Sequence, residues 1–283
     1  MLKKVAAIND ISGIGKCSLT AAIPILSVLG VQACPLPTAV LSSQTGFPSY
    51  FIDDYTSKMK SYIDEWHKLD LQFDGIHSGF LANASQVDII LDFISRFKQK
   101  NTIFLVDPVM GDDGEIYPAF NPSFCEKIKM LVSKADIITP NLTEACILTG
   151  KDFAQLTLSK EKSDYLSLIE NLGQELLLQG PSRVVITGIR YQSETDPAEQ
   201  IYNAVIEADN VYYTKSLAYD VSYSGTGDIF ASVLCGFLVQ GKSVHEAADK
   251  ATRLIGLSVR DAYNENIDRN YGINFEKYLK EIL

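Results

Sequence analysis

The chain has 283 residues, of which 46% are hydrophobic and 21% are charged, as is typical of a globular protein. Its 25 basic and 35 acidic residues give a formal net charge of −10, so nucleic acids and anionic membranes are poor partners for its surface. An anionic substrate would therefore need a local positive site, built from backbone N–H groups or a metal ion.

Several features of the chain favour a cytoplasmic location. The first residues lead into a strand-like segment and lack the apolar core of a signal peptide. No apolar run reaches the roughly 18 residues that a membrane span needs. The five cysteines form no CxxC pair, and their odd number is typical of reduced, mostly buried thiols. We therefore expect a cytoplasmic protein with no membrane contact.

Short apolar segments alternate with helical patterns along the chain. Residues 5–8 predict a buried strand, which a glycine turn connects to the first helix. Helices are expected near residues 18–29, 55–66 and 87–97, and further strands at residues 74–79, 103–106, 136–138 and 184–186. Ser85 and Asp88 suggest a capping box before the third helix. This alternation predicts an α/β fold with a mostly parallel sheet covered on both faces, in a single domain over residues 1–283.

Two regions depart from the alternation. Residues 31–52 contain three prolines among apolar residues, which is typical of edge strands or a flap. Residues 201–206 and 211–214 are joined by a polar turn and predict an antiparallel pair at one edge of the sheet. The polar stretch 192–200, which precedes that pair, is expected to be a surface loop.

The most informative segment is Gly225-Thr226-Gly227-Asp228, a glycine-rich turn that leads directly into an apolar helix. Glycines allow unusual backbone angles, and the free N–H groups at the start of a helix favour negative charge. Such a turn can bind phosphate. A carboxylate beside bound phosphate is useful if it accepts a proton from an attacking hydroxyl. The alternative is an ordinary turn followed by an acidic residue at a helix start.

Three segments together resemble a known family. Gly225–Asp228 resembles the GxGD signature of ribokinase-like sugar and vitamin kinases. Asp107-Pro108-Val109-Met110-Gly111-Asp112 and Thr139-Pro140-Asn141-Leu142-Thr143-Glu144 are similar to segments of pyridoxal kinases, and the three occur in the family order. The resemblance implies a three-layer α/β/α fold with a mostly parallel sheet and antiparallel edge strands.

The resemblance also implies an activity. It is the ATP-dependent phosphorylation of the 5′-hydroxymethyl group of pyridoxal, pyridoxamine or pyridoxine, which serves salvage of pyridoxal 5′-phosphate. Asp228 would be the catalytic base, and the amides of Gly225, Thr226 and Gly227 would stabilise the transferred group. Magnesium is implied as a cofactor beside ATP, potassium often accompanies it in the family, and a homodimer is the common assembly.

The resemblance places metal and nucleotide contacts on particular residues. Asp107, Asp112 and Glu144 would hold the metal, and loop carboxylates suit Mg²⁺ carried with phosphates. The nucleotide would contact Asn141, Glu144, Thr187 and Gly188. Both sets have a plainer alternative, because Asp112 can belong to a polar turn and the N-x-x-E spacing of Asn141 and Glu144 is itself a capping signature. The two interpretations of Asn141 and Glu144 are compatible.

The acceptor end of the expected site lies near the first strand. Residues 8–16 contain glycines but match neither a phosphate-binding GK[ST] loop nor a dinucleotide fingerprint, which argues against an NAD-linked oxidoreductase. By position, Asp10 and Ser12 resemble the family's ring-binding segment, Thr45 its substrate-binding threonine, and Phe80 its stacking aromatic residue. Without the resemblance, Thr45 and Phe80 would be assigned to packing of the flap.

Two other functions fit the same family. One is a hydroxymethylpyrimidine kinase, because the segment near Asp10 and Ser12 is also similar to the DPSGGAG segment of those enzymes. That branch usually ends its signature in GTGC, and Asp228 at this position therefore favours vitamin B6. The other is a non-catalytic protein that binds a vitamer or nucleotide on the same fold, against which the intact acidic cluster argues.

Overall fold

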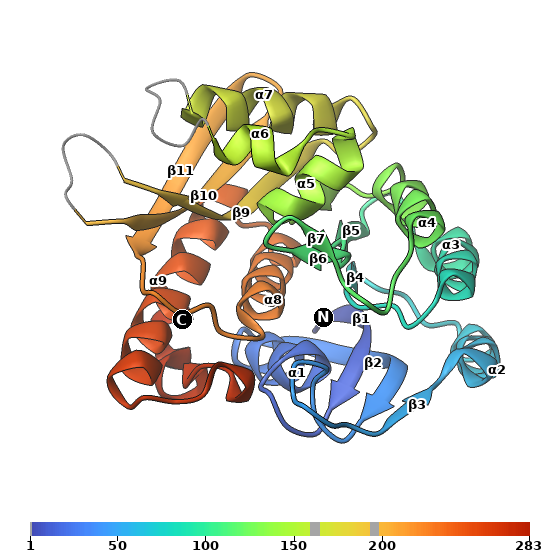
Figure 1. Cartoon of the computed structure of the whole chain (residues 1–283). Helices are drawn as coiled ribbons and strands as arrows, with labels where there is room; N and C mark the ends of the chain where they lie inside the picture. Colours follow the sequence, from blue (N-terminus) through green and yellow to red (C-terminus); the bar gives the residue numbers. More distant parts are fainter. Residues whose placement is uncertain (1, 159–164, 193–197) are drawn as a thin grey trace.

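The computed structural model describes residues 2–158, 165–192 and 198–283. Its centre is a sheet of nine strands in the order β11-β10-β9-β8-β5-β4-β1-β2-β3 (Figure 1). The strands are β1 (Lys3–Ser12), β2 (Val31–Leu41), β3 (Ile52–Asp54), β4 (Gly75–Ser78), β5 (Ile103–Val106), β8 (Ile137–Ile138), β9 (Arg183–Tyr191), β10 (Gln200–Glu207) and β11 (Asn210–Leu217). A separate small hairpin joins β6 (Gly111–Asp112) to β7 (Glu115–Ile116).

The six strands from β2 to β9 in the middle of the sheet run parallel to one another. The sheet ends in antiparallel pairs, with β3 beside β2 at one edge and β10 between β9 and β11 at the other. Because the central strands are parallel, their carboxyl ends meet at one edge of the sheet. In α/β folds this is the edge at which ligands bind.

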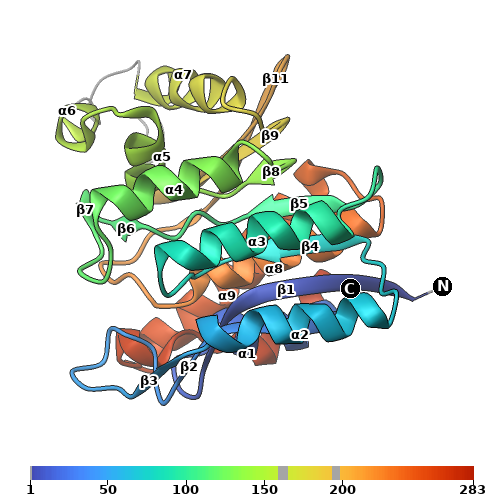
Figure 2. The ribbon, with the colours of Figure 1, turned by 90° about the vertical axis from the view of Figure 1, so that its right-hand side faces the viewer.

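Helices cover one face of the sheet in a continuous layer. They are α2 (Thr56–Lys68), α3 (Ala84–Phe97), α4 (Pro122–Val132), α5 (Leu142–Thr149) and α7 (Tyr165–Leu177), with the short α6 (Phe153–Thr157) beside α5. Figure 2 shows α2, α3 and α4 side by side in this layer. Their apolar residues form one core with alternate residues of the strands, such as Ala6 and Ile8 of β1.

The opposite face carries α1 (Ser18–Val28), α8 (Thr226–Val239) and α9 (Val244–Asn264), followed by the 3₁₀ segments η1 (Arg269–Tyr271) and η2 (Phe275–Ile282). Val5 and Ala7 of β1 face this second core. Every residue from 229 to 239 of α8 is buried, because α8 lies between the sheet and its neighbours α1 and α9. A helix that is apolar all round is a core helix, so the start of α8 is held firmly in place.

Most predicted elements are confirmed, and one capping signal is wrong. Helix α3 begins at Ala84, and its N-cap is Asn83, whose side chain accepts a hydrogen bond from the Ser85 amide. Ser85 therefore lies inside the first turn, and the capping box predicted at Ser85 and Asp88 does not form. Asn83 is a better cap because its short side-chain carbonyl reaches the amide two residues ahead.

The proline-rich region forms β2 and the edge strand β3, which confirms the edge strand expected there, and residues 42–51, which contain Pro48, form the loop between them. Pro35 and Pro37 pair with β1 on one side, whereas β3 covers only the Ala39–Leu41 end of β2 on the other. These two prolines thus occupy the part of β2 that forms an open edge, where a missing N–H costs no ladder hydrogen bond.

The antiparallel pair predicted near the other edge is confirmed as β10 and β11. The middle of the expected surface loop, 193–197, lies outside the described residues. Within the described ranges, no helix has the length and apolarity that a bilayer crossing requires.

Candidate active site

All residues predicted for the site line one cleft of about 980 Å³ at the carboxyl edge of the sheet. They are Asp10, Ser12, Thr45, Phe80, Asp107, Asp112, Asn141, Glu144, Thr187, Gly188, Gly225, Thr226, Gly227 and Asp228. They come from strands of the sheet, from loops that follow these strands, from the β6–β7 hairpin and from the starts of α5 and α8. The fold thus brings these segments together, although they span more than 200 positions of the sequence.

The start of α8 has no side-chain cap. Gly225 is the N-cap, with φ 81°, and a side chain there would collide with the carbonyl oxygen of Lys16. Both the left-handed backbone and this close approach require glycine. In the described part of the chain, no protein acceptor binds the N–H groups of Gly225, Thr226 or Gly227. These amides are therefore available to an anionic ligand.

Asp228 lies on the first turn of α8 and turns its carboxylate into the cleft. Its Oδ1 accepts a hydrogen bond from Asn9 Nδ2 at 2.9 Å. Burial raises the pKa of Asp228 to about 6, and the charge of Asp10 adds to the rise, while the backbone N–H of Ser18 and the side chain of Asn9 oppose it. A carboxyl with a pKa near 6 is ionised at neutral pH and can still accept a proton.

Asp107 follows β5 and faces the start of α8. It is 8% exposed, and Thr139 donates to its Oδ1 at 3.1 Å. Its Oδ2 lies 3.8 Å from the point where a side chain on Gly227 would begin. Burial, together with the charge of Asp228, raises the pKa of Asp107 to about 7. Two carboxylates thus face the same space, which favours a cation between them or a shared proton.

Asn141 and Glu144 form the reciprocal capping box that their spacing allowed. Asn141 Oδ1 accepts from the Glu144 amide, and Glu144 Oε2 accepts from the Asn141 amide, each at 2.9 Å. Glu144 Oε1 accepts from Met110 N at 3.1 Å, and Asn141 Nδ2 donates to the Gly111 carbonyl at 2.8 Å. The pair therefore ties α5 to the loop after Asp107. Burial and the charge of Asp107 raise the pKa of Glu144 well above its usual value.

Asp112 belongs to the β6–β7 hairpin, which overhangs the cleft. Burial and the neighbouring Asp113 raise the pKa of Asp112, and Arg269 opposes the rise from across the opening. The Gly114 amide is bound to Thr143 Oγ1 at 2.8 Å, which holds the hairpin against α5. No three His, Cys, Asp or Glu side chains of the described residues gather closely enough to hold a metal by themselves. Mg²⁺ commonly uses one or two carboxylates together with substrate phosphates and water, so Asp107 and Asp112 fit that role.

The first strand supplies the floor of the cleft. Asp10 is 4% exposed and accepts hydrogen bonds from Ser12 Oγ at 2.7 Å and Ser18 Oγ at 2.5 Å. Burial raises the pKa of Asp10, and these hydroxyl donors oppose the rise. Among the described residues, the carboxylate is therefore stabilised by hydroxyl groups. Ser18 has φ 51°, an uncommon backbone angle for a residue with a side chain; its hydroxyl donates to Asp10, and its backbone N–H lowers the pKa of Asp228.

Thr45 and Phe80 flank the floor from two loops. Thr45 is exposed at the mouth of the cleft, in the turn after β2. Phe80 follows β4, is half-buried, and lies with its ring 5.8 Å from that of Phe120, at an interplanar angle of 38°. The Phe80 carbonyl accepts from Thr38 Oγ1 at 2.9 Å, which fixes its backbone.

The far end of the cleft is suited to a larger ligand. Thr187 is half-buried, and Gly188, with φ 71°, has open space where a side chain would lie. The Gly188 amide donates to Asn203 Oδ1 at 3.2 Å. Two basic residues line the cleft, and Arg190 is already bound to Glu199 and to the Tyr219 carbonyl. Arg269 makes no hydrogen bond or ion pair through its side chain within the described residues.

Comparison with known proteins identifies the family. The model of the phosphomethylpyrimidine kinase family matches residues 18–273. The chain belongs to this family. A crystal structure of a Bacteroides thetaiotaomicron protein, provisionally assigned as a phosphomethylpyrimidine kinase and solved with pyridoxal, is 37% identical. It has a TM-score of 0.90 and covers 100% of this chain and 96% of its own. The structure of pyridoxal kinase from Lactobacillus plantarum is 26% identical, with a TM-score of 0.86 and coverage of 100% and 97%.

Sequence relatives agree with these structures. A pyridoxine/pyridoxal/pyridoxamine kinase of Bordetella avium is 26% identical over 244 residues, covering 83% of this chain and 77% of its own. A pyridoxal kinase of Dictyostelium discoideum is 24% identical over 279 residues, covering 94% and 87%. The ribokinase-like α/β/α fold expected from the three motifs is confirmed, and the protein is a kinase.

Three residues of this kinase cleft were missed by the sequence prediction. Asn9 donates to Asp228, the backbone N–H of Ser18 lowers the pKa of Asp228, and Arg269 of η1 lines the cleft. Asn9 has no motif of its own, since it lies next to Asp10 in a strand. Ser18 was assigned only to a helix start, and its positive φ could not be foreseen. Arg269 is brought to the cleft by the packing of η1 against the turn before α8, where Ser224 N donates to its carbonyl at 3.1 Å.

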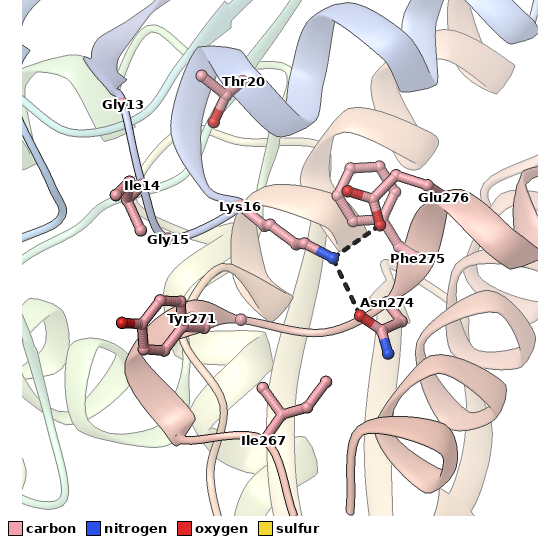
Figure 3. A pocket seen from close by; sticks show the side chains of 11 residues that line it. Gly13, Ile14, Gly15, Lys16, Thr20, Ile267, Tyr271, Asn274, Phe275 and Glu276 are labelled. Atoms are coloured by element: carbon pink, nitrogen blue, oxygen red, sulfur yellow. Dashed lines mark hydrogen bonds and ion pairs between the residues drawn. The ribbon is translucent and has the colours of Figure 1, made fainter. Parts of the chain in front are cut away.

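A second, smaller cavity of about 490 Å³ lies behind the first-strand loop of the kinase. Figure 3 shows Lys16 pointing from this loop toward Asn274 and Glu276, to which its Nζ is bound at 3.0 Å each. On the other side of the same loop, the Lys16 carbonyl lies against Gly225. Asn274 and Glu276 thus fix the loop against which the turn at Gly225 rests.

Proposed function

We propose that this kinase transfers the γ-phosphoryl group of ATP to the 5′-hydroxymethyl group of pyridoxal, pyridoxamine or pyridoxine. The main support for the proposal is that the Asp228 carboxylate and three backbone N–H groups without an acceptor among the described residues lie together at one end of the cleft. The same cleft can also hold a flat ring. The names of the relatives support the acceptor, and the structural relative solved with pyridoxal supports it further.

The chemistry follows from the positions of these groups. The acceptor hydroxyl gives its proton to Asp228 as its oxygen bonds to the γ-phosphorus, and the bond from that phosphorus to ADP breaks. The amides of Gly225, Thr226 and Gly227 hold the charge that spreads over the transferred oxygens. Since these amides are fixed before the substrate binds, little reorganisation is needed during the reaction.

The nucleotide is assigned to the far end of the cleft, along Asn141, Glu144, Thr187 and Gly188. A magnesium ion would be held by Asp107 and Asp112, with Glu144 behind them, and would neutralise charge on the β- and γ-phosphates. The side chains of Asn141 and Glu144 are engaged by the protein's own backbone, which supports an indirect role through the loops that they hold. Arg269 is suitably placed for a phosphate oxygen.

The acceptor ring is assigned to the space between Asp10, Ser12, Thr45 and Phe80. Phe80 would stack on the ring, and the polar groups of Asp10 and Ser12 would face its edge. Single-domain organisation, a homodimer, a cytoplasmic location and a potassium requirement remain predictions from the sequence and its resemblance.

A coupled assay of ADP formation tests the proposal, with pyridoxal, pyridoxamine, pyridoxine and hydroxymethylpyrimidine as acceptors. We expect at least one B6 vitamer to be phosphorylated with a kcat/KM at least about tenfold above that for hydroxymethylpyrimidine. The family match itself favours hydroxymethylpyrimidine as a second candidate acceptor. A higher kcat/KM for hydroxymethylpyrimidine would assign the enzyme to that substrate, and no acceptor-dependent ADP from any of the four compounds would reject the proposal.

A further inference from the structure

Asn9 occupies a buried position between the acceptor floor and the start of α8. It is 2% exposed and belongs to β1, where the pairing with β2 shifts in register between Asn9 and Ile11. Val5 and Ala7, which precede it at alternate positions, face the core that contains α8. The Asn9 side chain continues this row and therefore reaches the first turn of α8.

The hydrogen bonds of Asn9 fix the orientation of its amide. Its Oδ1 accepts from the backbone N–H of Phe80 at 2.8 Å and from that of Asp10 at 3.0 Å. Its Nδ2 must then point the other way, where it donates to Asp228 Oδ1 at 2.9 Å. A flipped amide would set its NH₂ group against two N–H donors and its oxygen against a carboxylate, so only one orientation satisfies all three contacts.

Gly79 provides the space for this arrangement. A side chain at Gly79 would collide with the Asn9 amide, and Gly79 is not among the residues with positive φ. Glycine is therefore required here by the close approach of Asn9 rather than by the backbone angle. Gly79 thus leaves room for the side-chain amide of Asn9, whose oxygen accepts from the Phe80 N–H.

We propose that Asn9 is the positioning residue of the reaction: it holds Oδ1 of Asp228, so that Oδ2 faces the acceptor hydroxyl. The same amide binds the backbone of Phe80 and Asp10, so the base and the acceptor pocket are placed by one side chain. This inference rests on the proposed function, because it assigns the role of Asn9 to the transfer step. An error of about 1 Å in such placement can cost about a hundredfold in rate.

The substitution Asn9→Asp tests the proposal most directly. An aspartate of nearly equal shape can still accept from Phe80 and Asp10, but it replaces the donor to Asp228 with a second carboxylate oxygen. We expect kcat to fall by about 10- to 100-fold, while KM for ATP and the dissociation constant for ADP change less than about twofold. Asn101→Asp is the matched control, because Asn101 is exposed just before β5, at the opposite end of the strands, and its kcat should be unchanged.

A double-mutant cycle separates positioning from general packing. If Asn9 acts through Asp228, Asn9→Asp should cause no further loss of activity in an Asp228→Ala background. Gly79→Ala should lower kcat as Asn9→Asp does, and should have little effect when combined with Asn9→Ala, which removes the collision. If Asn9→Asp fails to fold, Gly79→Ala provides the same test. Losses that multiply in both combinations would overturn the proposal.

One measurement does not depend on any reaction. In ¹⁵N NMR spectra, the side-chain NH₂ of Asn9 should exchange slowly with solvent in the wild-type protein and at least about tenfold faster in Asp228→Ala. Equal exchange in both proteins would overturn the proposed contact, whatever the substrate is. Slow exchange in a protein that phosphorylates none of the acceptors would instead reject the proposed function and leave the contact intact.

Discussion

The starts of α5 and α8 lie at the same edge of the sheet, yet they are built in opposite ways. At α5, Asn141 and Glu144 cap each other's backbone, and the helix start is satisfied by its own residues. At α8, Gly225 has no side chain, and the first amides have no acceptor among the described residues. The start of α5 is therefore satisfied by its own residues, whereas under the proposed function the start of α8 binds an anion. At a rigid, buried helix, we take the absence of a cap as the clearer sign of a binding role.

Removal of the base at α8 should give the largest effect. Asp228→Ala eliminates the proton acceptor but leaves the amides in place, so kcat should fall by about 10²- to 10⁴-fold. The dissociation constant for ADP, measured by calorimetry, should stay within about threefold. A variant with near-normal turnover would show that Asp228 is not the base and would remove the contrast between the two helix starts.

A side chain at Gly225, the uncapped start of α8, should have the next largest effect. Gly225→Ala places a side chain against the Lys16 carbonyl at φ 81°, so the turn must move, and kcat should fall by about 10²- to 10³-fold. Gly241→Ala is a matched control, because Gly241 has nearly the same φ, 80°, but no atom within 4 Å of a new side chain. It should cost about 1 kcal/mol of stability and leave kcat unchanged. Equal kcat values for the two variants would show that the approach to Lys16 is unimportant.

The pH dependence should also reflect the start of α8. Burial raises the pKa of Asp228 to about 6, and a base must be unprotonated to act. We expect kcat/KM to be level above this value and to fall about tenfold per pH unit below it as Asp228 is protonated. The profile should be measured with an acceptor whose own pKa values are known, so that its ionisation can be separated from that of Asp228. An unchanged kcat/KM down to pH 5 would contradict the assignment.

Disruption of the capping box at the start of α5 should give the smallest effect. Asn141→Ala removes the acceptor for the Glu144 amide and the bond to the Gly111 carbonyl, and should cost about 1–2 kcal/mol. For a chain of this size the melting temperature should fall by roughly 2–8 °C. A loss of kcat as large as that of Gly225→Ala, without loss of stability, would show that Asn141 contacts the substrate directly.

The sequence predicted the central parallel strands and the first three helices, because these depend on local periodicity, but it misplaced the start of the third helix. Gly225, Asp228 and Asp107, which it singled out from motifs, line one cleft in the structure. It could not predict that both oxygens of Glu144 would be used by backbone amides, since this depends on how the loop after Asp107 folds back. Asn9 was overlooked because a single asparagine in a strand carries no pattern, and only the tertiary contact with Asp228 reveals it.

The contacts of Lys16 with Asn274 and Glu276 have a consequence for biosynthesis. The loop after the first strand is held by residues that are 258 and 260 positions further along the chain. A nascent chain therefore cannot complete this side of the cleft until residues 274–276 and α8 have been synthesised. Contacts between such distant segments also slow folding, so the enzyme should gain activity only after these segments have met.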